Sequence, residues 1–201
     1  MTSPSPINSP TPRIPYLCVF CGSSTGIHPG FADVAQRLGE VLVQEGFGLV
    51  YGGGNIGLMG LLATTVLKKG GQVIGVIPRH LEEKELLHPN LTETHIVGSM
   101  HERKALMEKR ADGFISLPGG FGTLEECCEM LTWAQLQLHH KPCGILNCFG
   151  FFDGLLGFFD HQVSQGFVSQ ANRQLLLVAK DPETMVELLK PKLRSPPRSL
   201  P

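Results

Sequence analysis

Long apolar runs, a strong charge bias and a targeting signal are all missing from this sequence of 201 residues. No stretch approaches the roughly 18 uninterrupted apolar residues of a membrane-spanning helix, so we expect no transmembrane segment. The first residues, "MTSPSPINSPTPRIP", lack the apolar core of a secretory signal peptide, which leads us to expect a cytoplasmic protein. The formal net charge is −1, which gives no general electrostatic reason to bind nucleic acid or an anionic membrane.

The cysteines do not have the spacing of a zinc site. Cys18 and Cys21 form one C-x-x-C pair, but a zinc site needs two further ligands at comparable spacing, and no second pair exists. Cys18 lies in "YLCVFCGSS", a run typical of a buried strand, where a thiol packs as a small apolar group. We interpret the adjacent Cys127 and Cys128 as packing residues too. The sequence therefore predicts no metal, and no ligand cluster calls for one.

Proline is scarce in the middle of the chain. Nine of the fifteen prolines lie in residues 1–15 and 191–201, where they are mixed with polar residues. This composition is typical of disordered extensions. We therefore expect two tails of this kind around one domain of residues 16–190.

Between the tails, short β-rich runs alternate with helical stretches. Expected strands lie in residues 16–22, 48–54, 72–78, 94–99, 113–120, 143–148 and 175–180, and expected helices in residues 29–45, 56–69, 99–111, 123–138, 152–165 and 182–189. Several of the strands are apolar on both faces, as in a parallel sheet covered by helices on each side. The pattern predicts a single α/β domain with a Rossmann-like, doubly wound, mainly parallel sheet. Ligands of such sheets bind beyond the carboxyl ends of the strands.

Two glycine-rich loops follow strands and open into helices. They are "YGGGNIGLMG" (residues 51–60) and "LPGGFGT" (residues 117–123). Either loop suits a phosphate, because backbone N–H groups and the positive end of a helix dipole attract anions. For the first loop, a tight turn with glycines needed for packing is the competing interpretation. The first loop has neither the place after the first strand nor the acidic partner of a dinucleotide fingerprint, so a dinucleotide cofactor is not indicated.

Two glutamates follow the second loop in "TLEE". Thr123 and Glu126 have the spacing of a capping box, with Thr123 as N-cap, which would make Glu126 a residue of local stability alone. The alternative is catalytic, because a carboxylate beside a bound phosphate can face a sugar carbon that becomes cationic in the transition state. Both interpretations stay open for Glu126 at this point, and a catalytic role for its neighbour Glu125 stays open as well.

Positive charges lie in "SMHERKALMEKRA" (residues 99–111). Ser99 and Glu102 form another capping box, which places the start of this helix at the ligand edge of the sheet. Arg103 and Lys104 come just after it and suit a phosphate or carboxylate. The competing interpretation is a solvated helix face shared with Lys109 and Arg110. We interpret Glu85, in "IPRHLEEKEL", as a charged surface residue.

Taken together, these motifs resemble one family. "PGGFGTLEE" fits a P-G-G-x-G-T-x-x-E signature and "MHERK" fits the M-H-x-R-K that accompanies it. "YGGGNIGLMG", "VIGVIP" and "LTWAQLQLHHKP" fit as well. The chain from residue 16 to residue 189 resembles the LONELY GUY (LOG) family of cytokinin riboside 5′-monophosphate phosphoribohydrolases, whose members are often mislabelled lysine decarboxylases. The resemblance implies a homodimer without a cofactor, in which each chain hydrolyses the N-glycosidic bond of an adenosine-type 5′-monophosphate.

The resemblance also implies roles for individual residues. Arg103 and Glu126 would be the catalytic pair. Substrate would be bound by Glu85, Arg103, Lys104, Gly119, Gly120, Phe121, Gly122, Thr123, Leu124, Glu125 and Thr132. The alternative function is a non-catalytic nucleotide or molybdenum-cofactor carrier, which would not need a carboxylate at the sugar. Pyridoxal phosphate is not implied, because no lysine is singled out for a Schiff base.

Overall fold

The computed structural model describes residues 13–82 and 86–193. Seven parallel strands form one sheet in the order β4-β3-β2-β1-β5-β6-β7. The strands are β1 (Tyr16–Phe20), β2 (Gly48–Tyr51), β3 (Val73–Pro78), β4 (Glu93–Val97), β5 (Gly113–Ser116), β6 (Cys143–Leu146) and β7 (Leu176–Ala179). The predicted doubly wound fold is confirmed, and strand order reverses between β1 and β5.

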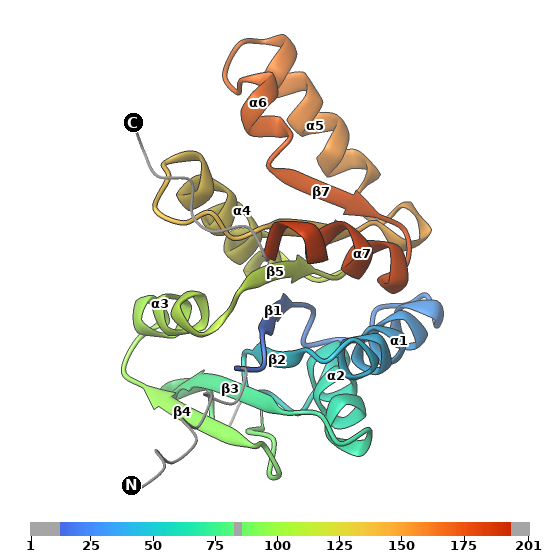
Figure 1. The fold of residues 1–201 in the computed structure, drawn as a ribbon, viewed down its shortest axis with the longest axis vertical. Helices are drawn as coiled ribbons and strands as arrows, with labels where there is room; N and C mark the ends of the chain where they lie inside the picture. The colour runs from blue at the N-terminus through green and yellow to red at the C-terminus, as the bar shows by residue number, and fades with distance from the viewer. Residues whose placement is uncertain (1–12, 83–85, 194–201) are drawn as a thin grey trace, which may run out of the picture.

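Helices cover both faces of the sheet. They are α1 (Gly30–Gln44), α2 (Gly57–Lys68), α3 (Met100–Arg110), α4 (Phe121–Gln135), α5 (Asp153–Ser164), α6 (Gln170–Arg173) and α7 (Pro182–Leu193), with 3₁₀ turns η1 (Arg79–Leu81) and η2 (Cys148–Gly150). Figure 1 shows α1, α2 and α7 on one side of the sheet and α3 and α4 on the other. The pair α5 and α6 lies beyond them, next to the edge strand β7.

Burial explains the strand sequences. Every residue of β2, β3, β5 and β6 is buried, as expected of inner strands covered on both faces. The edge strand β4 instead alternates between partly buried and exposed residues. Between α1 and α2, Gly39 lies so close to Thr65 that a Cβ would come within 3.0 Å of it. This close packing fixes α1 against α2, and the first turns of both helices border the carboxyl edge of the sheet.

The helices differ most from the prediction at both ends of α4, which stops at Gln135 and not at Leu138, at the end of α7 and in one additional helix. The structure starts α4 at Phe121, two residues before the predicted Thr123, and extends α7 to Leu193, past the predicted end at Leu189. The short helix α6 was not predicted. Its N-cap is Ser169, whose hydroxyl accepts a hydrogen bond from the Asn172 N–H at 3.1 Å.

The cysteines confirm the packing interpretation except at one position. All six are free thiols; five are buried, and Cys128 is exposed, contrary to the prediction. Burial raises the pKa of the Cys18 thiol well above its usual value and that of Cys127 to about 11, so neither is poised as a thiolate. Over the two described ranges, His, Cys, Asp and Glu side chains form no group of three that could hold a metal ion. In the same ranges, no helix has the length and apolar character needed to cross a membrane.

Candidate functional site

The strand-end loops meet where strand order reverses. Gly22, just after β1, donates its N–H to the Pro118 carbonyl at 3.0 Å, and its own carbonyl accepts the Leu58 N–H at 3.1 Å. A Cβ on Gly57 would lie 2.2 Å from the Ser23 carbonyl carbon, so this position must be glycine. The loops that follow β1, β2 and β5 are therefore one interlocked unit at the switch point, the usual place for a ligand in such sheets.

The loop after β5 opens toward solvent at the start of α4. Gly120 is the N-cap in an extended conformation, and Phe121, the first helical residue, is 93 % exposed. A Cβ on Gly120 or Gly122 would meet no atom of the described residues within 4 Å. The Leu124 N–H donates to the Gly120 carbonyl at 3.2 Å, and the amides before it belong to the part of a helix that has no intrahelical acceptor. This loop keeps the properties of an anion site that the sequence predicted.

The predicted capping box at Thr123 is wrong. Because Gly120 is the N-cap, Thr123 is the third residue of α4 and is buried. Its hydroxyl packs against Gly119, where an added Cβ would lie 2.1 Å from Thr123 Oγ1. Glu126 is then a residue of the second turn and not a capping partner, which removes the purely local explanation for its presence.

Arg103 is buried in the first turn of α3. It is 5 % exposed, and its Nη2 donates to the Gly52 carbonyl at 3.0 Å. Ser99 is confirmed as the N-cap of α3: its Oγ accepts the Glu102 N–H at 3.1 Å, and Glu102 Oε2 accepts the N–H of Gly98, one residue before the cap, at 2.8 Å. The interpretation of Arg103 as part of a solvated helix face is therefore wrong.

Lys104 is also buried, and it faces carboxylates. Its ammonium donates to Glu125 and, at 3.0 Å, to Glu129, both on α4. Burial acts to lower the pKa of Lys104, but the hydrogen bonds to Glu125 and Glu129 outweigh it and raise this pKa. The contact joins α3 to α4 and so fixes the relative positions of Arg103 and the start of α4.

Glu126 and Arg103 lie close to the same strand. Burial, and after it the negative charge of Glu126, raises the pKa of Cys18 in β1, while the positive charge of Arg103 acts in the opposite direction. Glu126 also acts to raise the pKa of Cys21, after burial. The charge of Glu126 thus acts on Cys18 in β1 and on Cys21 just after it, and the charge of Arg103 acts on Cys18.

The glycines after β2 serve packing. Gly52, Gly53 and Gly54 are all buried, and Gly53 adopts a φ of +81°. A Cβ on Gly52 would lie 1.9 Å from Arg103 Nη2. These contacts support the packing interpretation of this turn, while its role in binding phosphate stays a prediction.

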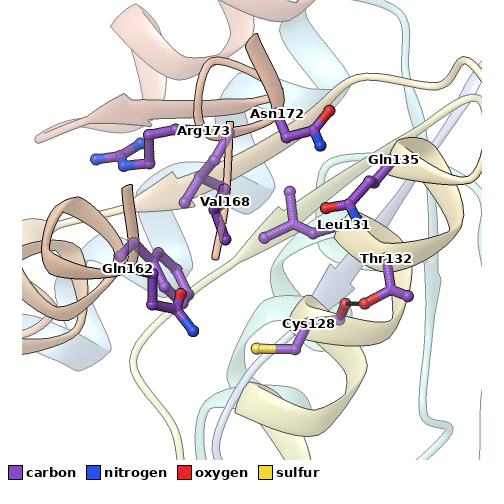
Figure 2. Close-up of a pocket in the computed structure, with 10 residues that line it drawn as sticks. Cys128, Leu131, Thr132, Gln135, Gln162, Val168, Asn172 and Arg173 are labelled. Atoms are coloured by element: carbon purple, nitrogen blue, oxygen red, sulfur yellow. Dashed lines mark hydrogen bonds between the residues drawn. The ribbon is translucent and has the colours of Figure 1, made fainter. Parts of the chain in front are cut away.

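Thr132 lies apart from this group, about 13 Å further along α4 than Thr123 at the α-helical rise of about 1.5 Å per residue. Its hydroxyl donates to the Cys128 carbonyl at 2.7 Å. Both residues line a cavity of about 230 Å³ between α4, α5, α6 and β7, opposite Gln162, Val168 and Asn172 (Figure 2). The role of Thr132 in binding substrate stays a prediction.

Two further glutamates, Glu85 and Glu129, need separate mention. Glu85 lies outside the described residues, so its predicted role is untested. Glu129 was overlooked, although its position four residues after Glu125 on a helix was a usable signal, since such residues share a face.

Comparisons with known proteins identify relatives over most of the chain. The sequence profile of the family described as "Possible lysine decarboxylase" matches residues 59–189. A rice protein (Oryza sativa subsp. japonica) named "Probable cytokinin riboside 5'-monophosphate phosphoribohydrolase LOGL5" is 50 % identical over 167 residues, which cover 83 % of this chain and 68 % of the relative. Cytokinin riboside 5'-monophosphate phosphoribohydrolase LOG7 of Arabidopsis thaliana is 46 % identical over 177 residues, covering 88 % of this chain and 82 % of that protein.

Solved structures with the same fold include carriers. The molybdenum cofactor carrier protein of Chlamydomonas reinhardtii superimposes with a TM-score of 0.69 at 22 % identity, over 91 % of this chain and 100 % of that one. The molybdenum cofactor binding protein of Rippkaea orientalis gives a TM-score of 0.66 at 24 % identity, over 90 % and 98 %. At this identity the likeness supports the fold alone.

Proposed function

Because the chain belongs to the LOG family of cytokinin riboside 5′-monophosphate phosphoribohydrolases, we propose that it hydrolyses the N-glycosidic bond of adenosine-type 5′-monophosphates. The products are the free base, either adenine or an N6-substituted adenine with cytokinin activity, and ribose 5-phosphate. The observation that supports this best is the arrangement of an open helix start, a buried arginine and a second-turn carboxylate at one switch point.

The 5′-phosphate binds at the start of α4. Gly120 and Gly122 leave room for phosphate oxygens at the first amides of the helix, and the helix dipole adds attraction. The exposed ring of Phe121 lies beside this position and offers an apolar contact to the nucleotide. Lys104 has its charge balanced by Glu125 and Glu129, so it holds the two helices together rather than supplying the main positive charge for the phosphate.

The reaction needs a group that favours positive charge on the sugar. As the bond between C1′ and the base nitrogen breaks, C1′ becomes oxocarbenium-like, and the Glu126 carboxylate stabilises that charge. Glu126 also orients a water, whose oxygen bonds to C1′ while one of its protons goes to the departing base. Arg103, fixed by the Gly52 carbonyl, stabilises the negative charge of the ribose phosphate.

Lysine decarboxylation, the activity in the family description, gains no support from Lys104, the buried lysine next to Arg103. A Schiff-base lysine needs a lowered pKa so that its amine is neutral and nucleophilic. Lys104 is instead held as an ammonium by two carboxylates, which raise its pKa. A non-catalytic nucleotide or molybdenum-cofactor carrier would not need the Glu126 carboxylate beside a sugar.

The deciding experiment compares nucleotides with nucleosides. We expect the purified protein to release base from AMP and N6-isopentenyl-AMP, and to act at least 100-fold less efficiently on the matching nucleosides, since these lack the group bound by α4. Free base is quantified by liquid chromatography, and the ratio of the two nucleotides gives the base preference. If no base forms from either nucleotide while both still bind, the proposed hydrolysis fails and the carrier alternative is favoured.

The proposal includes a homodimer, supported by exposed apolar residues on neighbouring elements. Every residue of α5 is at least partly exposed, and Leu138, Phe158 and Phe167 are all largely solvent-accessible. Large apolar side chains exposed in this way are typical of interaction surfaces. Light scattering is expected to give the dimer mass for the wild type and a lower mass for Phe158→Asp. The control is Ile96→Asp on the opposite edge strand, and a monomeric wild type contradicts this part of the proposal.

A cytoplasmic location is also part of the proposal. Its support is the state of the cysteines, since all six are free thiols, as is usual in a reducing compartment.

A further inference from the structure

His88 is a buried histidine outside the proposed catalytic group. It is 6 % exposed and lies in the segment between η1 and β4. Its Nδ1 accepts the Asn90 N–H at 3.3 Å, and its Nε2 lies 3.2 Å from Thr64 Oγ1 on α2. Because Nδ1 is an acceptor, the proton of the neutral ring is on Nε2, which donates to Thr64. Burial lowers the pKa of His88, which favours this neutral form.

The backbone next to His88 is paired with the turn after β2. The His88 N–H donates to the Gly53 carbonyl at 3.0 Å, and the Asn55 N–H donates to the Leu86 carbonyl at 2.9 Å. Gly54 and Leu87 form an antiparallel bridge between these two bonds. Residues 86–88 and 53–55 thus form a short two-stranded ladder that the side chain of His88 anchors to α2.

Strain in this segment indicates that it is held firmly. Leu86 has a φ of +49°, in the left-handed region that a residue with a branched side chain rarely adopts. Such a conformation persists only where surrounding contacts over-determine it. The ladder and the His88–Thr64 contact are the contacts that hold it here.

The ladder begins at Gly53, next to Gly52, the residue whose carbonyl contacts Arg103. Gly52 precedes Gly53 in the ladder, and its carbonyl accepts the hydrogen bond from Arg103 Nη2 at 3.0 Å. We infer that His88 is a positioning residue for the hydrolysis: by tying residues 86–88 to α2, it fixes the turn after β2 and with it the Gly52 carbonyl that orients Arg103. The inference rests on the proposed function, because it takes Arg103 as a group that acts on the substrate.

His139 provides a closely matched control. It is also 6 % exposed, its Nδ1 accepts the N–H of the residue two positions later, Lys141, at 3.1 Å, and its Nε2 donates to the Met130 carbonyl at 3.0 Å. Burial lowers its pKa as well. It lies beyond the C-terminal end of α4 and contacts Phe114, with a ring separation of 5.3 Å, so it shares the chemistry of His88 but not its link to Arg103.

The test compares His88→Phe with His139→Phe. Both variants are expected to lower the melting temperature, but His88→Phe is expected to reduce kcat for AMP by about 10-fold to 100-fold, as small displacements of catalytic groups do, with KM changed much less because the α4 loop is intact. His139→Phe is expected to keep kcat within about twofold, since only stability is affected. His88→Gln, whose amide can still donate to Thr64, is expected to retain more of the wild-type kcat than His88→Phe does. Thr64→Val, which removes the acceptor, is expected to reproduce part of the loss of kcat seen in His88→Phe.

A second readout does not depend on activity. Hydrogen exchange of the Asn55 amide, which the ladder protects, is expected to accelerate in His88→Phe and not in His139→Phe. Equal effects of the two variants on kcat, or a normal kcat in His88→Phe, would overturn the inference while leaving the proposed function intact. If the wild type releases no base at all, the proposed function fails. The role of His88 is then still tested by hydrogen exchange, because an unchanged exchange rate at Asn55 in His88→Phe would refute it.

Discussion

Replacing Glu126 by glutamine is expected to lower kcat for base release from AMP by about 10²-fold to 10⁴-fold, the usual contribution of a positioned acid–base or charge-stabilising group. Glutamine has the same shape but no negative charge, so it cannot stabilise a cationic C1′. The melting temperature is expected to stay within a few degrees, because Gly120, and not Thr123 with Glu126, caps α4. Kinetics with AMP and a thermal melt of the same preparation measure both quantities.

The matched control for this variant is Glu187→Gln. Glu187 is an exposed glutamate on α7, which covers the opposite face of the sheet. This control is expected to change neither rate nor stability beyond experimental scatter. If Glu126→Gln hydrolyses AMP at the wild-type rate and loses only stability, Glu126 is a structural residue and the mechanism is wrong.

Substituting alanine for Gly52 is expected to abolish activity by displacing the side chain of Arg103, although Gly52 itself is not among the residues proposed to bind substrate. A Cβ at this position would lie 1.9 Å from Arg103 Nη2 and 3.1 Å from its Cζ, so the guanidinium must move. The resulting loss of kcat is expected to approach that of Arg103→Ala, and the double variant to be little worse than either single one, since both remove the same interaction. Steady-state kinetics of the three variants measure this coupling.

Gly154→Ala is the control for the glycine substitution. Gly154 lies in α5, where a Cβ would meet no described atom within 4 Å, and alanine favours the helix by about 1 kcal/mol. This variant is expected to keep full activity. Additive losses in Gly52→Ala and Arg103→Ala would mean that the two residues act separately, contrary to the geometry.

The strands and the helices between them could be predicted from the sequence because the patterns that indicate them are local. Inner strands such as Val73–Pro78 are apolar throughout, and the helices between strands begin and end near glycine, proline or a capping residue. Ser99 illustrates this, since its capping box predicts the start of α3 and the structure has it there. Loop positions at the carboxyl edge follow from the strand order alone.

The start of α4 could not be predicted in the same way. Threonine is a common N-cap, and Thr123 with Glu126 has the spacing of a capping box, so local preference pointed to the wrong residue. Glycine is also accepted as an N-cap, and Gly120 in an extended conformation starts the helix earlier. The packing of the Thr123 hydroxyl against Gly119 decides between them, and that contact is visible only in three dimensions.

The partners of the positive charges also depend on the tertiary fold. Arg103 meets the carbonyl of Gly52, 51 residues earlier, and Lys104 meets Glu125 and Glu129 on the next helix. Sequence reasoning identified both cations but left open whether they face solvent. Only the packing of α3 against α4 and the turn after β2 shows that they are buried and what they contact.

A structure of the Glu126→Gln variant with AMP bound tests the central claim most directly. The account predicts phosphate oxygens within roughly 2.7–3.2 Å of the first amides of α4, and the side chain of residue 126 facing C1′ of the ribose. A phosphate bound elsewhere, such as at the turn after β2, or a ribose on the far side of α4 from residue 126, would contradict it.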